Sequence, residues 1–354
     1  MLPVPGAMTS PGHFSCRMSV YRAMDILKEE YGASQDRLRP AKFGNHLFCL
    51  RSCNMANFPA GPNRTRRLER RLGDAMRARL PFAVAEFVMF GLKQAWAAIF
   101  GALLLFGILF SNHIWQPDWV LARYDALLMY ALALQALLLW TGMESWREVR
   151  VILLFHLTGT AMEIFKVHMG SWSYPGDGLF KIYQVPVFSG FMYASVGSYM
   201  ARVIRLFDMR FAPYPPYWMP LLLAAAIYGN FFAHHFLPDM RVALIAATVI
   251  IFLRTRIWFT IGHNRYWMPL PLAAFLSSFF LWLAENIGTG TRTWLYHGQA
   301  PTDWVSLAKM GSWYLLLYVS FATVTLVFRE ALSDKALHAS RPRVKDPTGA
   351  AKAP

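Results

Sequence analysis

Hydrophobic residues gather in eight long blocks between residues 88 and 328, and short polar stretches separate the blocks. Each block is near the roughly 20 residues that an α-helix needs to cross the hydrocarbon core of a bilayer. The blocks cover residues 88–111, 121–142, 149–169, 185–207, 217–237, 240–261, 266–287 and 304–328. The pattern predicts an all-α fold, namely a polytopic membrane helical bundle with about eight transmembrane helices.

Polar and basic residues dominate the two ends of the chain. Residues 1–80 contain no long apolar run and include Pro, Gly and Arg clusters such as AGPNRTRRLERRLGDAMRARL. Such a composition is typical of a segment that buries too little apolar surface to fold alone. We therefore expect a basic, mostly disordered or loosely helical cytoplasmic arm over 1–80, an eight-helix membrane domain over 81–330, and a basic disordered tail over 331–354.

The distribution of charge predicts the orientation of the bundle. The chain of 354 residues is 56% hydrophobic and 16% charged and has a net charge of +15. Its Lys and Arg residues lie mainly in the two ends and in alternate loops, which is how membrane proteins set their topology. The loops on one side carry Arg147, Arg150, Arg202, Arg205, Arg210, Arg254, Arg256 and Arg265. We expect N-in/C-in topology with the lipid bilayer as partner and no nucleic-acid partner; the sequence indicates no oligomeric state.

One spacing of acidic and aromatic residues occurs twice. The pattern E-x8-W-x-Y begins at Glu163 in the third block and again at Glu285 in the seventh. Its aromatic residues are Trp172 and Tyr174 in the first copy and Trp294 and Tyr296 in the second. Because the two blocks are four apart, the match favours a 4+4 parallel duplication.

A second repeat does not fit that duplication. The segments YWMPLLLAA and YWMPLPLAA begin at Tyr217 and Tyr266, at the start of the fifth and seventh blocks. Trp and Tyr favour the membrane interface, and Pro suits the first turn of a helix. We expect both segments to anchor the start of a helix that enters from the cytoplasm.

The predicted topology gathers polar side chains on the outer side of the membrane. The third, fifth and seventh blocks all run outward, so their last residues lie at the same depth as the loops that follow them. We expect acid or base roles for Glu163, Glu285, His234 and His235. We expect a substrate pocket lined by Trp172, Tyr174, Asn230, Asn286, Trp294, Tyr296 and Tyr193.

Structural interpretations compete with these roles. Glu163 can form an ion pair with Lys166 at the i, i+3 spacing of a helix. The Trp and Tyr residues can serve as interfacial anchors alone. His234 and His235 are adjacent, so their side chains diverge by about 100° on a helix, and one of them at most faces a shared site.

The sequence favours no metal site. His46, Cys49 and Cys53 offer too few ligands for a closed zinc site. The remaining histidines lack the repeated spacing of membrane di-iron enzymes, and no nucleotide or nucleophilic-serine motif is present. We predict no metal and leave the cofactor unknown.

Several segments together resemble one known family. They are HLTGTAMEIFKVHMGSWSYPGDG, VPVFSGFMYASVGSYMARVIRLFDMRF, NFFAHHFLPDMR, FLRTRIWF and LAENIGT. Over about residues 82–330 the chain is similar to a bacterial family catalogued as domain of unknown function 817. The resemblance implies a multi-pass protein of the bacterial cytoplasmic (inner) membrane, and it implies no activity.

A more distant resemblance concerns the first acidic–aromatic motif. The segment GSWSYP, followed by VPVFSGFMY, is similar to membrane carotenoid cyclases of the lycopene type and carotenoid hydratases. Those enzymes protonate an alkene, and a glutamic acid in apolar surroundings suits that chemistry. After Pro186 this chain has VFSG where the cyclases have two acidic residues, a departure that weighs against the cyclase reaction.

Three functions are therefore weighed. The first is a membrane enzyme that uses acid/base chemistry on a lipid or isoprenoid at the outer leaflet. The second is a proton-coupled small-molecule transporter, which intramembrane carboxylates also suit. The third is a structural or assembly membrane protein whose polar side chains only pack its helices together.

Overall fold

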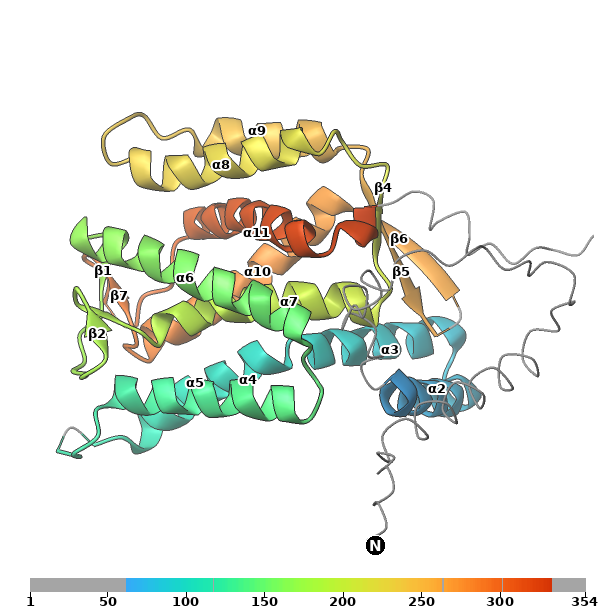
Figure 1. The fold of residues 1–354 in the computed structure, drawn as a ribbon, viewed down its shortest axis with the longest axis horizontal. Helices are drawn as coiled ribbons and strands as arrows, with labels where there is room; N and C mark the ends of the chain where they lie inside the picture. Colours follow the sequence, from blue (N-terminus) through green and yellow to red (C-terminus); the bar gives the residue numbers. More distant parts are fainter. Residues whose placement is uncertain (1–61, 117, 263, 301, 333–354) are drawn as a thin grey trace, which may run out of the picture. The chain divides into compact units, whose positions relative to one another are not determined.

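Helices form over all eight apolar blocks in the computed structural model, which describes residues 62–332 apart from 117, 263 and 301 (Figure 1). The helices are α2 (Pro62–Arg79), α3 (Phe82–Ala97), α4 (Ile99–Ile114), α5 (Arg123–Trp140), α6 (Trp146–His168), α7 (Ser189–Leu206), α8 (Trp218–Ala233), α9 (Arg241–Phe252), α10 (Leu270–Gly290) and α11 (Leu307–Val327). A 3-10 turn, η1 (Arg329–Leu332), follows α11. The expected disordered segments 1–61 and 333–354 lie outside the described residues. The helical fold class is confirmed.

Fewer helices than blocks have the length and composition to cross a membrane. Among the described residues, α6, α10 and α11 meet both requirements, and α3 with α4 adds a fourth candidate that is bent by 67°. Helices α8 and α9 are apolar but shorter. The structure thus has three to four candidate spans, and the count of eight transmembrane helices stays a prediction.

A β-hairpin occupies the boundary that the sequence assigned to two helices. Strands β5 (Arg256–Ile261) and β6 (Asn264–Pro269) pair antiparallel, and β4 (Arg210–Ala212) pairs with β5 on its other side. Hydropathy alone does not distinguish such short apolar strands from helix ends, although RIWFTI has the β-branched and aromatic content of a strand. The expected helix start at Tyr266 is therefore wrong, whereas Tyr217 does precede α8.

Helix α2, within the expected arm, is tied to this hairpin through Glu86 of α3. Arg77 of α2 donates two hydrogen bonds to Glu86 Oε1, at 3.0 Å from Nε and 2.9 Å from Nη2. The Tyr266 hydroxyl donates to Glu86 Oε2 at 2.9 Å. The last residues of the predicted arm are thus an ordered helix.

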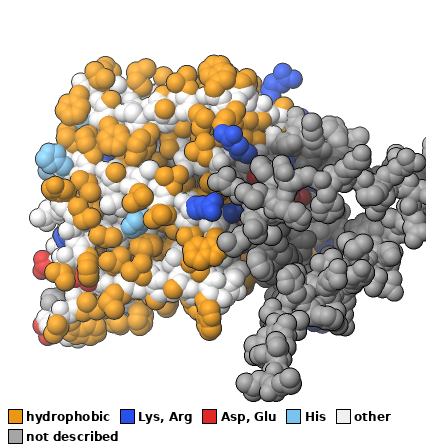
Figure 2. All heavy atoms as spheres, viewed as in Figure 1, with side chains coloured by type: hydrophobic (Ala, Val, Ile, Leu, Met, Phe, Trp, Pro, Cys, Tyr) orange, Lys and Arg blue, Asp and Glu red, His pale blue; other side chains and the backbone are white. Residues whose placement is uncertain are grey.

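Large apolar side chains remain exposed on the helices. Phe87, Trp140, Val242, Ile250 and Phe280 are each 68–86% exposed. Figure 2 shows hydrophobic side chains across the helical face, with acidic and histidine side chains at its left end. Exposed apolar surface on this scale indicates a lipid environment.

Two matching helix–strand–helix corners form one end of this bundle (Figure 1). Helix α6 leads through β1 (Trp172–Ser173) and the β2–β3 hairpin (Lys181–Ile182, Val185–Pro186) to α7, and α10 leads through β7 (Leu295–Tyr296) to α11. Strands β1 and β7 pair antiparallel, with Trp172 opposite Tyr296. The corners match each other, and the full 4+4 duplication stays a prediction.

Candidate functional site

Glu163 is a buried carboxylate held by three aromatic hydrogen-bond donors. It lies in the last two turns of α6 and is 3% exposed. Trp172 Nε1 and the Tyr174 hydroxyl each donate to its Oε2 at 2.7 Å. The Tyr193 hydroxyl, from α7, donates to its Oε1 at 2.5 Å. Three donors satisfy the carboxylate without a basic side chain.

Glu285 repeats this arrangement at the end of α10. Trp294 Nε1 donates to its Oε1 at 2.9 Å, and the Tyr296 hydroxyl donates to the same oxygen at 2.6 Å. Its third donor is Trp313 Nε1 of α11, at 3.0 Å from Oε2. Each glutamate is thus bound by its own W-x-Y pair and by one residue of the next helix.

The equal spacing of the two motifs has a local structural cause. Both helices end in a Schellman turn, in which the second residue past the cap donates back five positions. Ser171 N donates to Lys166 O at 2.9 Å, and Thr293 N donates to Gly288 O at 3.0 Å. The left-handed residue of the turn is Gly170 in the first corner (φ +69°) and Arg292 in the second (φ +53°). The turn reverses the chain, so Trp and Tyr reach back to the glutamate in the same register.

Close packing of glycine completes each corner. A Cβ atom on Gly288 would lie 1.9 Å from the Trp294 ring, and one on Gly159 would lie 2.5 Å from the Tyr193 ring. Any larger residue at these positions would displace an aromatic donor from its glutamate.

The two corners join into one aromatic cluster. Across the β1–β7 pair the rings of Trp172 and Tyr296 meet edge to face, with centroids 5.8 Å apart. Tyr193 and Trp313, the donors from α7 and α11, have ring centroids 6.3 Å apart. The pKa of Tyr296 lies well above its ordinary value, because it is buried and lies against Glu285. Its hydroxyl is therefore protonated and available to donate.

The first turn of α5 forms hydrogen bonds to both corners. The Tyr124 hydroxyl donates to Thr293 O at 2.7 Å and accepts a bond from Gly176 N at 3.4 Å. Arg123 Nη1 donates to Thr291 O at 3.1 Å. The sequence gives no sign of these contacts, because nothing in the spacing relates α5 to loops about 50 and 170 residues away.

The two predicted histidines contact Lys166 and neither glutamate. Lys166 Nζ lies 3.0 Å from His235 Nε2 and 3.3 Å from His234 Nε2. His235 also lies 3.5 Å from Ser171 Oγ, next to Trp172. The alternative ion pair between Glu163 and Lys166 does not form. The histidines belong to a neighbouring cluster, one helical turn beyond Glu163.

The two predicted asparagines form hydrogen bonds that stabilise the loops after α8 and α10. Asn286 accepts a bond from Val305 N at 2.8 Å and donates to Trp282 O. Asn230 accepts from Met240 N at 3.1 Å and donates to Asp239. Neither side chain contacts a glutamate, so the structure separates them from the aromatic cluster.

A small apolar cavity of about 40 Å³ lies between α6, α7, α8 and α11. Tyr193 is one of its lining residues, and the Tyr193 hydroxyl donates to Glu163. The other lining residues are Phe155, Thr158, Gly159, Met162, Val196, Tyr228, Leu316, Val319, Ser320 and Thr323. The cavity thus reaches Glu163 through one hydroxyl group.

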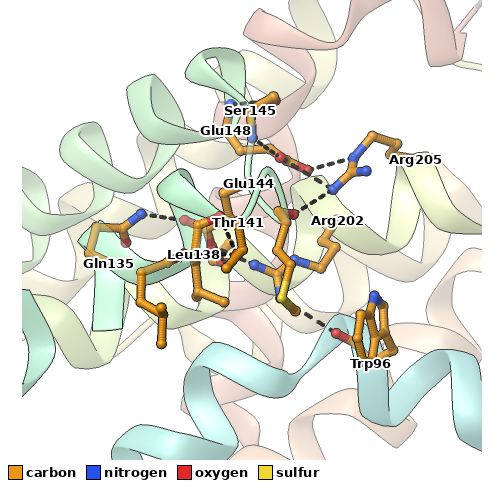
Figure 3. A network of polar contacts seen from close by, with 12 residues as sticks. Trp96, Gln135, Leu138, Thr141, Glu144, Ser145, Glu148, Arg202 and Arg205 are labelled. Carbon is orange, nitrogen blue, oxygen red and sulfur yellow. Dashed lines mark hydrogen bonds and ion pairs between the residues drawn. The ribbon is translucent and has the colours of Figure 1, made fainter. Parts of the chain in front are cut away.

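A separate buried ion pair joins the loop before α6 to the second half of α7 (Figure 3). Arg202 Nη2 lies 2.7 Å from Glu144 Oε1, and Ser198 Oγ donates to the same oxygen at 2.6 Å. Gln135 contacts the other oxygen of Glu144, and Arg205 pairs with Glu148 at 2.9 Å. The sequence assigned these arginines to topology alone, because charge counting gives no contact partner.

No metal site is evident in the described part of the chain. No group of three or more His, Cys, Asp or Glu side chains there lies close enough to bind one ion. Cys16, Cys49 and Cys53 lie outside the described residues.

These features define a helical membrane-type protein with two buried carboxylates bound by aromatic donors. The chain belongs to the family described as "Protein of unknown function (DUF817)", whose model matches residues 86–321. It is 43% identical over 243 residues to "Uncharacterized protein YoaT" of Bacillus subtilis (strain 168), a match covering 68% of this chain and 91% of that protein.

Two solved structures share a partial likeness at 15% sequence identity. They are a mycobacterial Insig homolog, MvINS from Mycobacterium vanbaalenii, and a cross-linked MvINS trimer. Each match covers 57% of this chain and 98% of the other chain, with a TM-score of 0.38.

Proposed function

We propose that this protein is a membrane enzyme that transfers protons to and from a lipid or an isoprenoid at the Glu163–Glu285 cluster. The proposal rests on one observation: Tyr193 contacts both Glu163 and the apolar cavity. Its hydroxyl donates to Glu163 at 2.5 Å, and the same residue lines the apolar cavity. A buried acid one hydroxyl away from an apolar cavity suits proton transfer to hydrocarbon.

The donor types around each glutamate support a division of roles. An indole N–H only donates, whereas a tyrosine hydroxyl both donates and accepts. Among the described residues, Oε1 of Glu163 accepts a hydrogen bond from Tyr193 alone, so a proton on that oxygen passes to the Tyr193 hydroxyl while the tyrosine proton turns to the cavity. Glu163 is therefore the proton source, acting through Tyr193.

Glu285 is suited to the opposite role. Each of its oxygens faces an indole donor, Trp294 at Oε1 and Trp313 at Oε2. Both oxygens must accept, which favours the ionised carboxylate. An ionised Glu285 and the surrounding aromatic rings would stabilise the positive charge that a protonated hydrocarbon carries. Return of the proton then gives an isomerised product without another reactant.

The orientation of the site follows the charge distribution. We place the aromatic cluster at the outer leaflet of the bacterial cytoplasmic membrane, with both termini inside. The loops at the opposite end of the bundle carry Arg147, Arg210, Arg254 and Arg256, which agrees with an excess of positive charge in the cytoplasm.

A comparison of lipid extracts tests the proposal. Strains lacking the gene would be complemented with wild type, Glu163→Gln, Tyr193→Phe or Glu330→Gln, and their extracts compared by mass spectrometry. Glu330 is the matched control carboxylate, since it pairs with Arg147 on the surface. Wild type and the control should restore the species that the deletion changes, whereas Glu163→Gln and Tyr193→Phe should not. Full restoration by Glu163→Gln, at equal protein levels in membranes, would refute the proposal.

A proton-coupled carrier is the second candidate. Half-buried His156 lies on α6 between Glu163 and the Glu144–Arg202 pair. Between them lie apolar side chains such as Val151 and Ala194, each fully buried. A carrier would have to hydrate that layer, and proton uptake by proteoliposomes under a substrate gradient distinguishes it from the enzyme.

A further inference from the structure

Lys166 is a buried cation whose near neighbours are not acidic. It is 3% exposed, and its Nζ contacts both His234 and His235. The Phe231 ring centroid lies 5.8 Å from Nζ. Among residues 62–332 as described, no carboxylate forms an ion pair with it. A buried charge without a counter-ion is costly, so this corner is suited to receive an anion.

Further positive charge from other helices faces the same corner. Lys309, at the start of α11, lies 3.8 Å above the Tyr296 ring. Arg241, at the start of α9, donates to Ser312 of α11 at 3.1 Å. Both act electrostatically on Lys166, and Asp239, which is paired with Arg241, offsets them in part. Three cations, from α6, α9 and α11, thus lie at this end of the bundle.

The apolar cavity leads to this corner along two helices. On α6 the cavity residues Gly159 and Met162 precede Lys166 by seven and four positions, the spacing of one helix face. On α8 Tyr228 lines the cavity, and the helix ends at Ala233, two residues before His235. The two helices also meet at Phe165 and Phe232, whose ring centroids are 4.8 Å apart.

We infer that the corner formed by Lys166, His234, His235 and Lys309 binds the phosphate headgroup of a membrane amphiphile whose hydrocarbon chain runs along α6 past the mouth of the cavity. Charge complementarity carries this choice, because lysine is a common phosphate ligand and the adjoining cavity is apolar. The inference rests on the proposed function, because a phosphate headgroup bound at Lys166 would place the hydrocarbon chain beside Tyr193. It names a phosphate-bearing lipid as the substrate class.

Binding by a matched lipid pair tests the inference. The purified full-length protein in detergent would be titrated with dioctanoyl phosphatidic acid, dioctanoylglycerol or inorganic phosphate, using tryptophan fluorescence. Wild type should bind the phosphatidic acid at least about tenfold more tightly than the uncharged lipid. Lys166→Met and His235→Gln should each lose most of that preference. Lys181→Met, which removes a cation from the same end of the bundle, should keep it.

Each outcome bears on the inference. Equal affinity of wild type for the two lipids would overturn it, as would an unchanged preference in both corner variants. If inorganic phosphate binds as tightly as phosphatidic acid, the acyl chains add no affinity. That result would refute binding of an amphiphile and show that the site binds a free anion. Glu163→Gln should bind phosphatidic acid normally. If that variant also restores the lipid extract, the proposed function fails while the headgroup site stands.

Discussion

At the residue scale, the two glutamates look equivalent but face different donors. Glu163 accepts one indole bond on Oε2, and its other oxygen faces only a tyrosine. Glu285 accepts an indole bond on each oxygen. The NH2 group of a glutamine can donate to a tyrosine hydroxyl, because the hydroxyl oxygen also accepts hydrogen bonds. It cannot bond an indole N–H, because both groups are donors.

This difference predicts unequal costs of glutamine. Glu163→Gln keeps the acceptor for Trp172 and Tyr174 and leaves only the Tyr193 O–H without its acceptor, so it should lower the free energy of unfolding by about 1 kcal/mol at most. Glu285→Gln leaves one amide facing an indole donor in either orientation, which should cost about 1–3 kcal/mol. Thermal unfolding in detergent measures both. The added change Trp313→Phe should relieve part of the Glu285→Gln loss, and equal losses in the two single variants would contradict this geometry.

The sequence indicates most residues of the two glutamate sites, because the Schellman turn fixes the spacing between each glutamate and its Trp and Tyr donors. Glu163, Glu285 and their W-x-Y partners follow from it directly. Trp313 corresponds to Tyr193 in the structure, but no sequence pattern marks it. The third donor differs in type between the copies, and it comes from the next helix rather than from the turn. No local periodicity marks a residue that is chosen by packing between helices.

At the element scale, the two Schellman turns differ at their left-handed residue. Gly170 adopts φ +69° without a Cβ penalty, whereas exposed Arg292 adopts φ +53° with one. Arg292→Gly should therefore stabilise the protein by up to about 1 kcal/mol, and Gly170→Ala should destabilise it by about 1 kcal/mol. Melting temperatures of the two variants check this pair, and a loss of stability in Arg292→Gly would contradict it.

The α8–α9 turn depends on one carboxylate. Burial acts to raise the pKa of Asp239, but hydrogen bonds from Arg241 and Asn230 and the charge of Arg241 outweigh it, so the pKa lies below its ordinary value of 3.8. The stabilisation is therefore complete above that ordinary value and is lost as the pH falls through the folded-state pKa. Wild type should melt above Asp239→Asn at neutral pH, and the gap should close in acid. A gap that is constant with pH would contradict this contribution.

Helices were easier to predict than the hairpin. The eight apolar blocks located every helix from α3 to α11, but β5 and β6 read as the ends of two spans. Their side chains are apolar enough to resemble helix ends, and pairing with β4, over 40 residues earlier, decides their conformation. The bend between α3 and α4 was missed because no Pro or Gly marks it: it falls at Ala98.

At the scale of the whole molecule, the account places the aromatic cluster outside and the β4–β6 end inside. In a background with Cys16, Cys49 and Cys53 replaced by Ser, Asp177→Cys should react with an impermeant maleimide in intact cells. Arg254→Cys should react only after the membrane is opened. Both residues are exposed. The reverse labelling pattern would place the cluster in the cytoplasm.

The central claim is that Glu163 delivers a proton through Tyr193 to carbon in the apolar cavity. Deuterium incorporation tests it most directly, because it requires no knowledge of the substrate. Purified protein would be incubated with total membrane lipid in deuterated buffer, and the extracted species analysed by mass spectrometry. The account predicts carbon-bound deuterium in one lipid or isoprenoid species with wild type and Glu330→Gln, and none with Glu163→Gln or Tyr193→Phe. Equal labelling by Glu163→Gln and wild type, or no labelling by folded wild type, would contradict it.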